Sequence, residues 1–278
     1  MSRLRIAVVG HVEHVTLGRV SEVPAPGAIV HLQRPFAFAG GGGGMAFAQL
    51  VRGPAEVHFL TAVGDDAAGD EVLAELRARG GHVHAVRRRE PHTRAVAMVD
   101  AAGERTIVVV GEPHHPEARD PLPWDALAGF DGAYFTAQDP AALRAARGAR
   151  VLVVAARRRA ALDASRVRAD VVVGSARDPR EASARADYAV HPGALVLTEG
   201  AQGGRVETAE GTFRFEAPPS PPPGGGAYGA GDSFAAALTF HLAAGRSLAD
   251  ACARAARHGA AVLQDVDPRA GQAALDDS

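Results

Sequence analysis

The sequence predicts an α/β fold, with a mostly parallel central sheet flanked by helices and a small second β-sheet. Short apolar runs of strand length alternate with Ala-, Leu- and Arg-rich runs of helical length through most of the chain, and this alternation is typical of βαβ units. Two segments, 12–39 and 92–111, interrupt the alternation and contain no convincing helical pattern. The chain has 278 residues, 47% of them hydrophobic, so one large domain can bury a substantial core.

The apolar runs expected to form buried strands of the main sheet are Ile6–Val9, Val57–Val63, Ala133–Thr136, Val151–Ala155, Val171–Gly174 and Leu195–Thr198. Helices are expected at Met45–Val51, Gly69–Arg79, Pro140–Arg147, Arg180–Ala186, Asp232–Ala244 and Ser247–Leu263. A hairpin at Gly204–Thr208 and Thr212–Glu216 follows the last core strand, and a loop rich in Pro and Gly spans Pro218–Gly226.

The second sheet is expected to form a lid from two separate segments. The first is rich in Pro and Gly, and the second is a hairpin in which Thr93–Val99 and Arg105–Val110 flank a turn. This assigns residues 1–11, 40–91 and 112–278 to the core, and residues 12–39 plus 92–111 to the lid. The apolar face of the hairpin could join two copies into a homodimer, although a sheet packed on its own core would give the same pattern.

Composition and charge exclude several classes of function. The net charge is −2 and 22% of the residues are charged, so no basic field recruits nucleic acid. The 30 cationic side chains are all arginine, which removes every mechanism based on lysine. Cys252 is the single cysteine, so disulfides within the chain and thiolate clusters are excluded. The first residues run directly into a strand and no apolar run could span a bilayer, so we expect a cytoplasmic protein without membrane contact.

One short motif suggests chemistry on a phosphoryl group. Gly229-Ala230-Gly231-Asp232 opens directly onto a helical run. Small residues let backbone N–H groups approach an anion, and the positive end of the helix acts at the same place. Asp232 would then accept the proton of a hydroxyl as its oxygen attacks a γ-phosphate. By themselves, the same residues could equally well form a turn and a helix cap.

Other glycine-containing segments support a ligand site. Thr198, Gly200 and Gly203 follow the last core strand with a spacing that leaves room for a nucleotide at its carboxyl end, where open α/β sheets bind ligands. Near the start of the chain, Gly40–Gly44 precede the helix expected from Met45, and they permit close approach of the backbone to a polyol.

Taken in order, these motifs resemble the PfkB/ribokinase family of carbohydrate and nucleoside kinases over nearly the whole chain. The matching segments are Gly10, Gly40–Gly44, Gly64-Asp65-Asp66, Gly103-Glu104-Arg105, Thr198 to Gly203 and Gly229 to Asp232. The resemblance implies a ribokinase-like fold with a β-lid, ATP and Mg²⁺ as cofactors, and phosphorylation of a sugar or sugar-like alcohol.

The resemblance also assigns roles to individual residues. Asp232 would be the general base, and the backbone of Gly229, Ala230 and Gly231 the anion hole. The nucleotide would contact Ser175, Thr198, Gly200, Gly203 and His258. The substrate would contact Glu13, Gly41, Gly42, Met45, Gln138 and Asp232.

The chain departs from the family pattern in two places. Gly226-Ala227 stand where the family has Asp-Thr, and Ser175-Ala176-Arg177-Asp178 stand where it has Asn-x-x-Glu. Asp178 or Glu181 would therefore hold Mg²⁺ through water. These departures leave two alternatives open, a non-catalytic sugar- or nucleotide-binding protein on the same scaffold and a nucleoside kinase.

Most histidines and short arginine runs are not expected to form sites. His82, His84, His114 and His115 are predicted to lie on surface loops. His11 and His14 beside Glu13 favour substrate hydrogen bonding or packing over metal binding. The runs Arg87–Arg89 and Arg157–Arg159 are predicted to be solvated loops, one of which could still contact an anionic substrate.

Overall fold

The computed structural model describes residues 3–219 and 225–276, and within them nine strands form one large sheet. The strands are β1 Arg5–Val9, β4 Glu56–Gly64, β5 His82–Arg88, β8 Gly132–Phe135, β9 Val151–Ala155, β10 Val171–Ser175, β11 Ala194–Thr198, β12 Gly204–Thr208 and β13 Thr212–Phe215. Their order is β13-β12-β11-β10-β9-β8-β1-β4-β5. All neighbours pair in parallel except β11 with β12 and β12 with β13. The predicted core strands are therefore confirmed.

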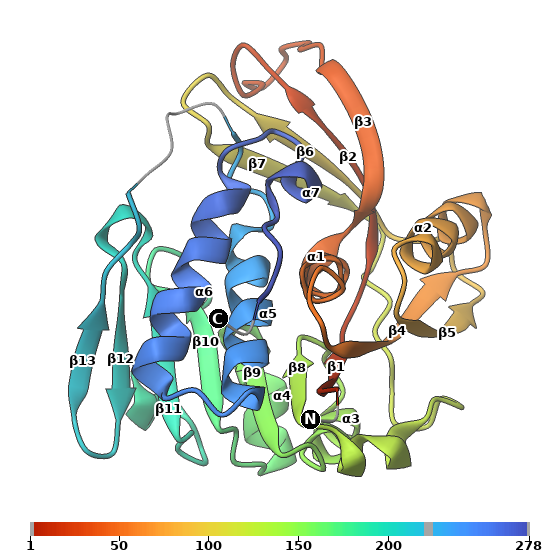
Figure 1. Cartoon of the computed structure of the whole chain (residues 1–278). Helices are drawn as coiled ribbons and strands as arrows, with labels where there is room; N and C mark the ends of the chain where they lie inside the picture. The colour runs from red at the N-terminus through yellow and green to blue at the C-terminus, as the bar shows by residue number, and fades with distance from the viewer. Residues whose placement is uncertain (1–2, 220–224, 277–278) are drawn as a thin grey trace.

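Helices cover both faces of this sheet (Figure 1). They are α1 Gly41–Leu50, α2 Ala67–Ala78, α3 Pro140–Ala146, α4 Arg159–Ser165, α5 Ala230–Ala243, α6 Leu248–Val262 and the short α7 Pro268–Gly271. Along β1, Ile6 and Val8 pack in the core on the side of α1, α2, α5 and α6. Ala7 and Val9 pack with α3 and α4 on the opposite side. The strand side chains alternate between two apolar cores, as in a parallel sheet covered on both faces.

A second sheet of four strands lies at one end of the molecule (Figure 1). It consists of β2 Glu13–Arg19, β3 Gln33–Gly40, β6 Arg94–Val99 and β7 Arg105–Val110, in the order β3-β2-β6-β7. Its buried side chains, among them Leu17, Phe38 and Ala97, pack with Met45 of α1 and Tyr228. The small second sheet predicted from the interrupted pattern is therefore confirmed.

Helix α1 begins at Gly41, four residues earlier than the predicted start at Met45. The prediction was wrong because glycine has a low helix propensity, whereas here close packing requires glycine in the first turn. Gly43 donates its amide to the carbonyl of His11 at 3.0 Å. A Cβ atom on Gly43 would lie only 2.5 Å from the same carbonyl oxygen. The glycines therefore let the first turn of α1 lie directly on the loop after β1.

The predicted helix at Arg180–Ala186 is absent, and a 3-10 turn at Arg185–Asp187 takes its place. The acidic side chains bond to the local backbone instead, since Asp178 accepts the amide of Arg180 at 2.9 Å and Glu181 accepts the amide of Ser175 at 2.8 Å. Such bonds compete with helix formation. The sequence patterns did not predict the helices α4 and α7 or the edge strand β5.

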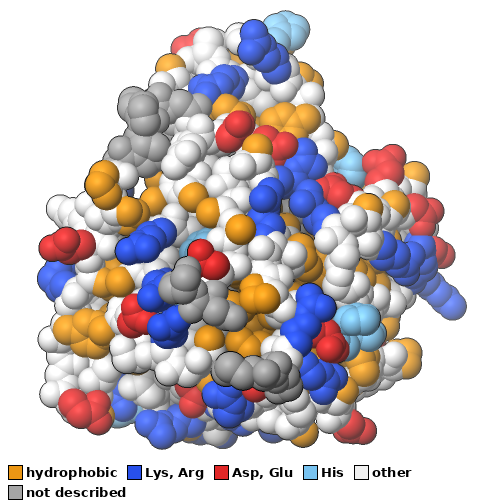
Figure 2. Space-filling model, in the orientation of Figure 1, with side chains coloured by type: hydrophobic (Ala, Val, Ile, Leu, Met, Phe, Trp, Pro, Cys, Tyr) orange, Lys and Arg blue, Asp and Glu red, His pale blue; other side chains and the backbone are white. Residues whose placement is uncertain are grey.

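The surface is mixed in charge. On the face drawn in Figure 2, arginine and acidic side chains are interspersed. Of the helices that the structure describes, none combines the length and the apolar character needed to cross a membrane. Of the predicted loop at Pro218–Gly226, residues 220–224 lie outside the described residues.

Candidate active site

The polar side chains of the candidate site gather at the carboxyl ends of the parallel strands. The loops after β1, β8, β9 and β10 and the first turns of α1 and α5 all meet there. Such an edge is where ligands bind in open α/β sheets. The site is therefore assembled from segments that are far apart in the sequence.

Asp232 lies in the first turn of α5. The helix follows Gly229, which has a φ of 76°, a conformation that favours glycine. The first amides of a helix have no partner within it, so those of Ala230 and Gly231 are available to a ligand. Gly231 is exposed, and a Cβ atom on it would meet nothing within 4 Å. The turn therefore presents two amides without a helical partner beside Asp232.

The surroundings of Asp232 raise the pKa of its carboxylate. The hydroxyl of Tyr134 donates to Oδ1 over 3.5 Å, and a Cβ atom on Gly42 would lie 3.1 Å from the same oxygen. Desolvation, with the charge of Glu181, raises the pKa of Asp232 to about 6. The carboxylate is thus ionised above pH 6 and is more basic than an ordinary aspartate.

Glu13 is a second buried carboxylate in the same place. It is 8% exposed, and its Oε1 lies 3.6 Å from Nε2 of His11. Burial and the charge of Asp232 raise the pKa of Glu13 to about 7. Glu13 also contacts Gly41, whose added Cβ would lie 3.1 Å from the Cγ of Glu13. The structure therefore brings the predicted residues Glu13, Gly41, Gly42 and Asp232 together.

Two arginines that the sequence predicted to lie in a solvated loop reach the candidate site. Arg157 and Arg158 follow β9 in a 3-10 turn. Arg157 pairs with Glu181 at 2.7 Å and with Asp178 at 2.8 Å, and its charge lowers the pKa of Asp232. Arg158 donates to the carbonyl of Thr136 at 2.8 Å. Their position directly after a parallel strand was the signal that could have identified them.

Histidines form another wall of the site. His11 and His115 are both buried, with ring centroids 5.0 Å apart. Burial lowers the pKa of His11, and it lowers that of His115 to about 3. The prediction that His114 and His115 lie on a surface loop was wrong, because both are buried. Neither ring nitrogen of His115 has a hydrogen-bond partner among the described residues, and burial keeps the imidazole neutral.

The segment predicted to contact the nucleotide lies at the ends of β10 and β11. Thr198 donates its hydroxyl to the carbonyl of Gly174 over 3.3 Å. Gly200 and Gly203 have φ values of 65° and 77°. The guanidinium of Arg177 packs against Gly200, since a Cβ atom there would lie 2.7 Å from Cζ of Arg177. Ser175, at the end of β10, is half-buried beside this segment.

Three other residues were predicted to contact the substrate or the nucleotide, and each has surroundings that differ from those of Glu13 and Asp232. Met45 is fully buried, and a Cβ atom on Gly229 would lie only 2.6 Å from Cε of Met45. Gln138 is exposed in the loop after β8. His258 is buried in α6 with its ring 6.1 Å from that of His241. Met45 thus supports the turn before Asp232 from behind.

The fold and the sequence have known relatives. The family model for pfkB family carbohydrate kinases matches residues 3–274. A protein of Agrobacterium tumefaciens provisionally named a ribokinase has a TM-score of 0.81 at 19% identity, with 98% of this chain and 94% of that chain covered. The ribokinase of Arabidopsis thaliana, solved with ribose and ATP, has a TM-score of 0.75 at 16% identity, with 98% and 96% covered.

Phosphofructokinase-2 of Escherichia coli, solved with substrates and products, has a TM-score of 0.74 at 16% identity, and 97% of each chain is covered. At these identities the likeness to the solved structures shows a common fold alone, whereas the family assignment rests on the match to the family model. No curated protein sequence matches the chain.

Proposed function

Because the chain belongs to the pfkB family of carbohydrate kinases, we propose that it transfers the γ-phosphoryl group of ATP to a hydroxyl of a sugar or sugar-like molecule. The observation that carries this proposal is the position of Asp232, a partly exposed carboxylate in the first turn of α5. Its charge raises the pKa of a second buried carboxylate, Glu13.

Asp232 is the proposed general base. With a pKa of about 6, it is ionised at neutral pH and can accept the proton that the substrate hydroxyl loses during attack. The amides of Gly229, Ala230 and Gly231 are the proposed anion hole, since the helix end favours negative charge on the phosphoryl oxygens. The packing of Met45 behind Gly229 would hold this turn in place.

Glu13, Gly41 and Gly42 are the proposed substrate contacts. The neutral imidazoles of His11 and His115 offer further hydrogen bonds to hydroxyl groups. Gln138, being exposed, would contact only a substrate that extends beyond this buried part of the site. The charge of Arg105 on β7 acts on Asp232, which supports a lid role for the small sheet.

The nucleotide is proposed to lie along Thr198, Gly200 and Gly203. The residues near its phosphates fit Mg²⁺, which prefers carboxylate oxygens. Glu181 is the better candidate, because its charge raises the pKa of Asp232 and among the described residues it pairs with Arg157 alone, whereas Asp178 pairs with both Arg157 and Arg180. When bound, Mg²⁺ neutralises charge on the phosphates. Arg157, which now balances Glu181, would remain as a positive group beside the transferred phosphoryl.

The replacement Asp232→Asn tests the base. We expect phosphoryl transfer to fall by at least about 100-fold, the size of a general-base contribution, while ATP binding measured by calorimetry persists. Asp70→Asn is the matched control, because Asp70 also lies in the first turn of a helix, α2, but is exposed. Full activity of Asp232→Asn, or an equal loss in the control, would contradict the assignment.

Two alternatives keep some support. A non-catalytic binding protein is favoured by the guanidinium of Arg177 against Gly200 and by Arg157 on both candidate metal ligands. A nucleoside kinase would use the same scaffold. A panel of sugars, polyols and nucleosides with ATP separates these possibilities, because a binding protein shows affinity without product and a nucleoside kinase turns over only nucleosides.

A homodimer through the lid is also proposed. Strand β7 is at the edge of its sheet, and Ile107, Val108, Val109 and Val110 on it are 38–53% exposed. An exposed apolar edge strand is a ready surface for pairing with another strand.

The reaction consumes ATP and needs neither membrane nor nucleic acid, so we place the protein in the cytoplasm.

A further inference from the structure

A group of histidines and one carboxylate lies at the other end of the large sheet, away from Asp232. Glu56 and His58 occupy alternate positions at the start of β4, so their side chains project from the same face. His82 begins β5 and pairs directly with His58, and His84 pairs with Leu60. Because β4 and β5 both start here, the group lies at the amino ends of the parallel strands, at the opposite edge from the candidate active site.

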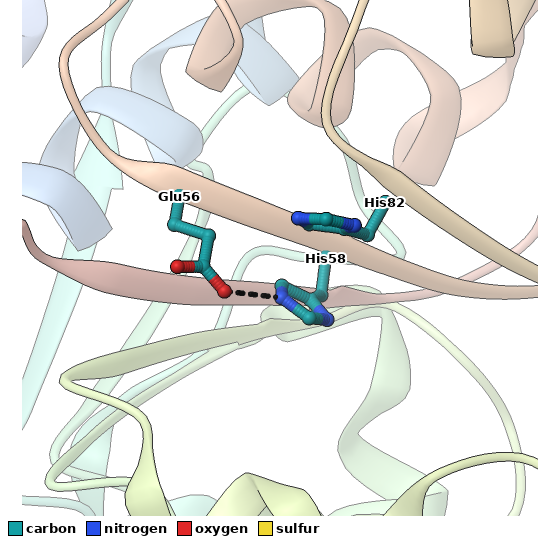
Figure 3. A group of neighbouring side chains, drawn as sticks. All are labelled: Glu56, His58 and His82. Carbon is teal, nitrogen blue, oxygen red and sulfur yellow. Dashed lines mark hydrogen bonds and ion pairs between the residues drawn. The ribbon is translucent and has the colours of Figure 1, made fainter.

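The three side chains Glu56, His58 and His82 point toward one another (Figure 3). Nε2 of His58 lies 2.8 Å from Oε1 of Glu56, and one ligand atom from each of the three residues lies within 4.8 Å of the others. Ligands at about 2.1 Å around a tetrahedral ion lie about 3.4 Å apart. His82 is exposed, so its ring can rotate to close this small gap.

His84 supports the arrangement from outside the group. Its Nε2 lies 3.0 Å from Nδ1 of His58. A hydrogen bond at Nδ1 leaves Nε2 of His58 as the atom that faces Glu56, in the way that metal-ligating imidazoles are oriented by a partner.

A small cavity adjoins the group. Its volume is about 270 Å³, and Glu56 and His82 line it together with Arg3 and Arg79. Three protein ligands leave one position of a tetrahedral ion open, and this cavity can hold the water or small anion that fills it. Arg5 lies 3.5 Å from Oε1 of Glu56 and is the cation that a metal ion would partly replace.

We propose that Glu56, His58 and His82 form a binding site for a divalent transition-metal ion, of which Zn²⁺ is the best match, with His84 orienting His58. Two imidazoles and one carboxylate suit Zn²⁺, whereas Mg²⁺ and Ca²⁺ prefer oxygen ligands. The ion would join β5, the edge strand of the large sheet, to β4. The site stabilises that edge and takes no part in phosphoryl transfer.

The test is calorimetric titration of the full chain, free of any affinity tag and stripped with EDTA, with ZnCl₂. The wild-type protein is expected to bind one ion at this site and to melt at a higher temperature with Zn²⁺. His84→Ala should weaken binding by roughly 10- to 100-fold, as loss of an orienting partner does. His82→Ala should weaken it further, and its exposed position means that the variant folds. Co²⁺ absorption should report the same losses.

His14→Ala is the matched control. His14 also contacts a carboxylate, Glu71, at 3.0 Å, but it is not part of the group that could hold a metal ion. It should retain wild-type Zn²⁺ affinity and the rise in melting temperature. Absence of Zn²⁺ binding to the wild type would overturn the proposal, and so would a His82→Ala variant that binds as tightly as the control.

Discussion

Replacing Glu13 by glutamine should stabilise the protein at high pH. Glu13 is 8% exposed, and burial together with the charge of Asp232 raises its pKa from the ordinary 4.5 to about 7. The folded protein therefore holds the proton on Glu13 more tightly than the unfolded chain does. As the pH rises from about 4.5 to about 7, the unfolded chain loses this proton first, and the free energy of unfolding falls.

The magnitude follows from the size of the shift. The pKa rises by about 2.5, and each unit is worth about 1.4 kcal/mol, so ionised Glu13 costs about 3 kcal/mol of stability above pH 7. Glutamine keeps the shape of the neutral side chain and cannot ionise. The difference in unfolding free energy between Glu13→Gln and wild type should thus grow from near zero at pH 4 to about 3 kcal/mol at pH 8.

Urea denaturation at pH 4, 6 and 8, followed by the fluorescence of Trp124, measures this difference. Glu71→Gln is the control, since the side chain of Glu71 is 69% exposed and its replacement should change the pH profile little. A difference for Glu13→Gln that stays constant with pH, or that favours the wild type at pH 8, would refute the reasoning about the buried carboxylate.

Three further outcomes are expected. Arg157→Ala should move the acidic limb of kcat/KM, expected near pH 6 from the pKa of Asp232, to higher pH, because the charge of Arg157 lowers that pKa; a pH–rate profile with an unmoved limb would contradict this. Gly42→Ala should lower kcat/KM by at least about 10-fold through misplacement of the reacting groups, because the new Cβ would lie 3.1 Å from Oδ1 of Asp232 and 3.2 Å from Oγ1 of Thr136; unchanged kinetics would contradict this. Val108→Lys should convert a dimer to a monomer in light scattering, because a charge on an exposed edge strand opposes strand pairing, and a protein that is monomeric before the change would exclude the lid dimer.

The order of strands and helices was readable from the sequence because it rests on local patterns. Buried parallel strands appear as continuous apolar runs such as Val151–Ala155, which the structure reproduces residue for residue. Misinterpreted elements are those whose local signal is opposed by contacts from elsewhere. Strand β5 was assigned to a loop because its polar residues His82 and His84 lie at an edge of the sheet, where one side is open to solvent.

The candidate site was only partly readable for the same reason. Asp232 and the glycines before it form a continuous motif at a helix start. Arg157 and His115 belong to no motif: the position of Arg157 after a parallel strand was its one signal, and nothing local distinguishes a buried histidine such as His115 from a solvated one. The roles of Glu13, Gly42 and Met45 stay predictions from the family resemblance, although the structure now shows that Glu13 lies against Gly41, Gly42 against Asp232 and Met45 against Gly229.

By itself, the sequence determined the α/β class, the existence of a second sheet and the carboxylate that begins α5, because periodicity and glycine spacing are properties of neighbouring residues. Only the tertiary structure decided that the charge of Arg157 acts on both Glu13 and Asp232, and that His58 and His82 face each other across two strands. Both depend on how separate segments pair and pack, since burial and the charges brought close by the fold determine the pKa of each group.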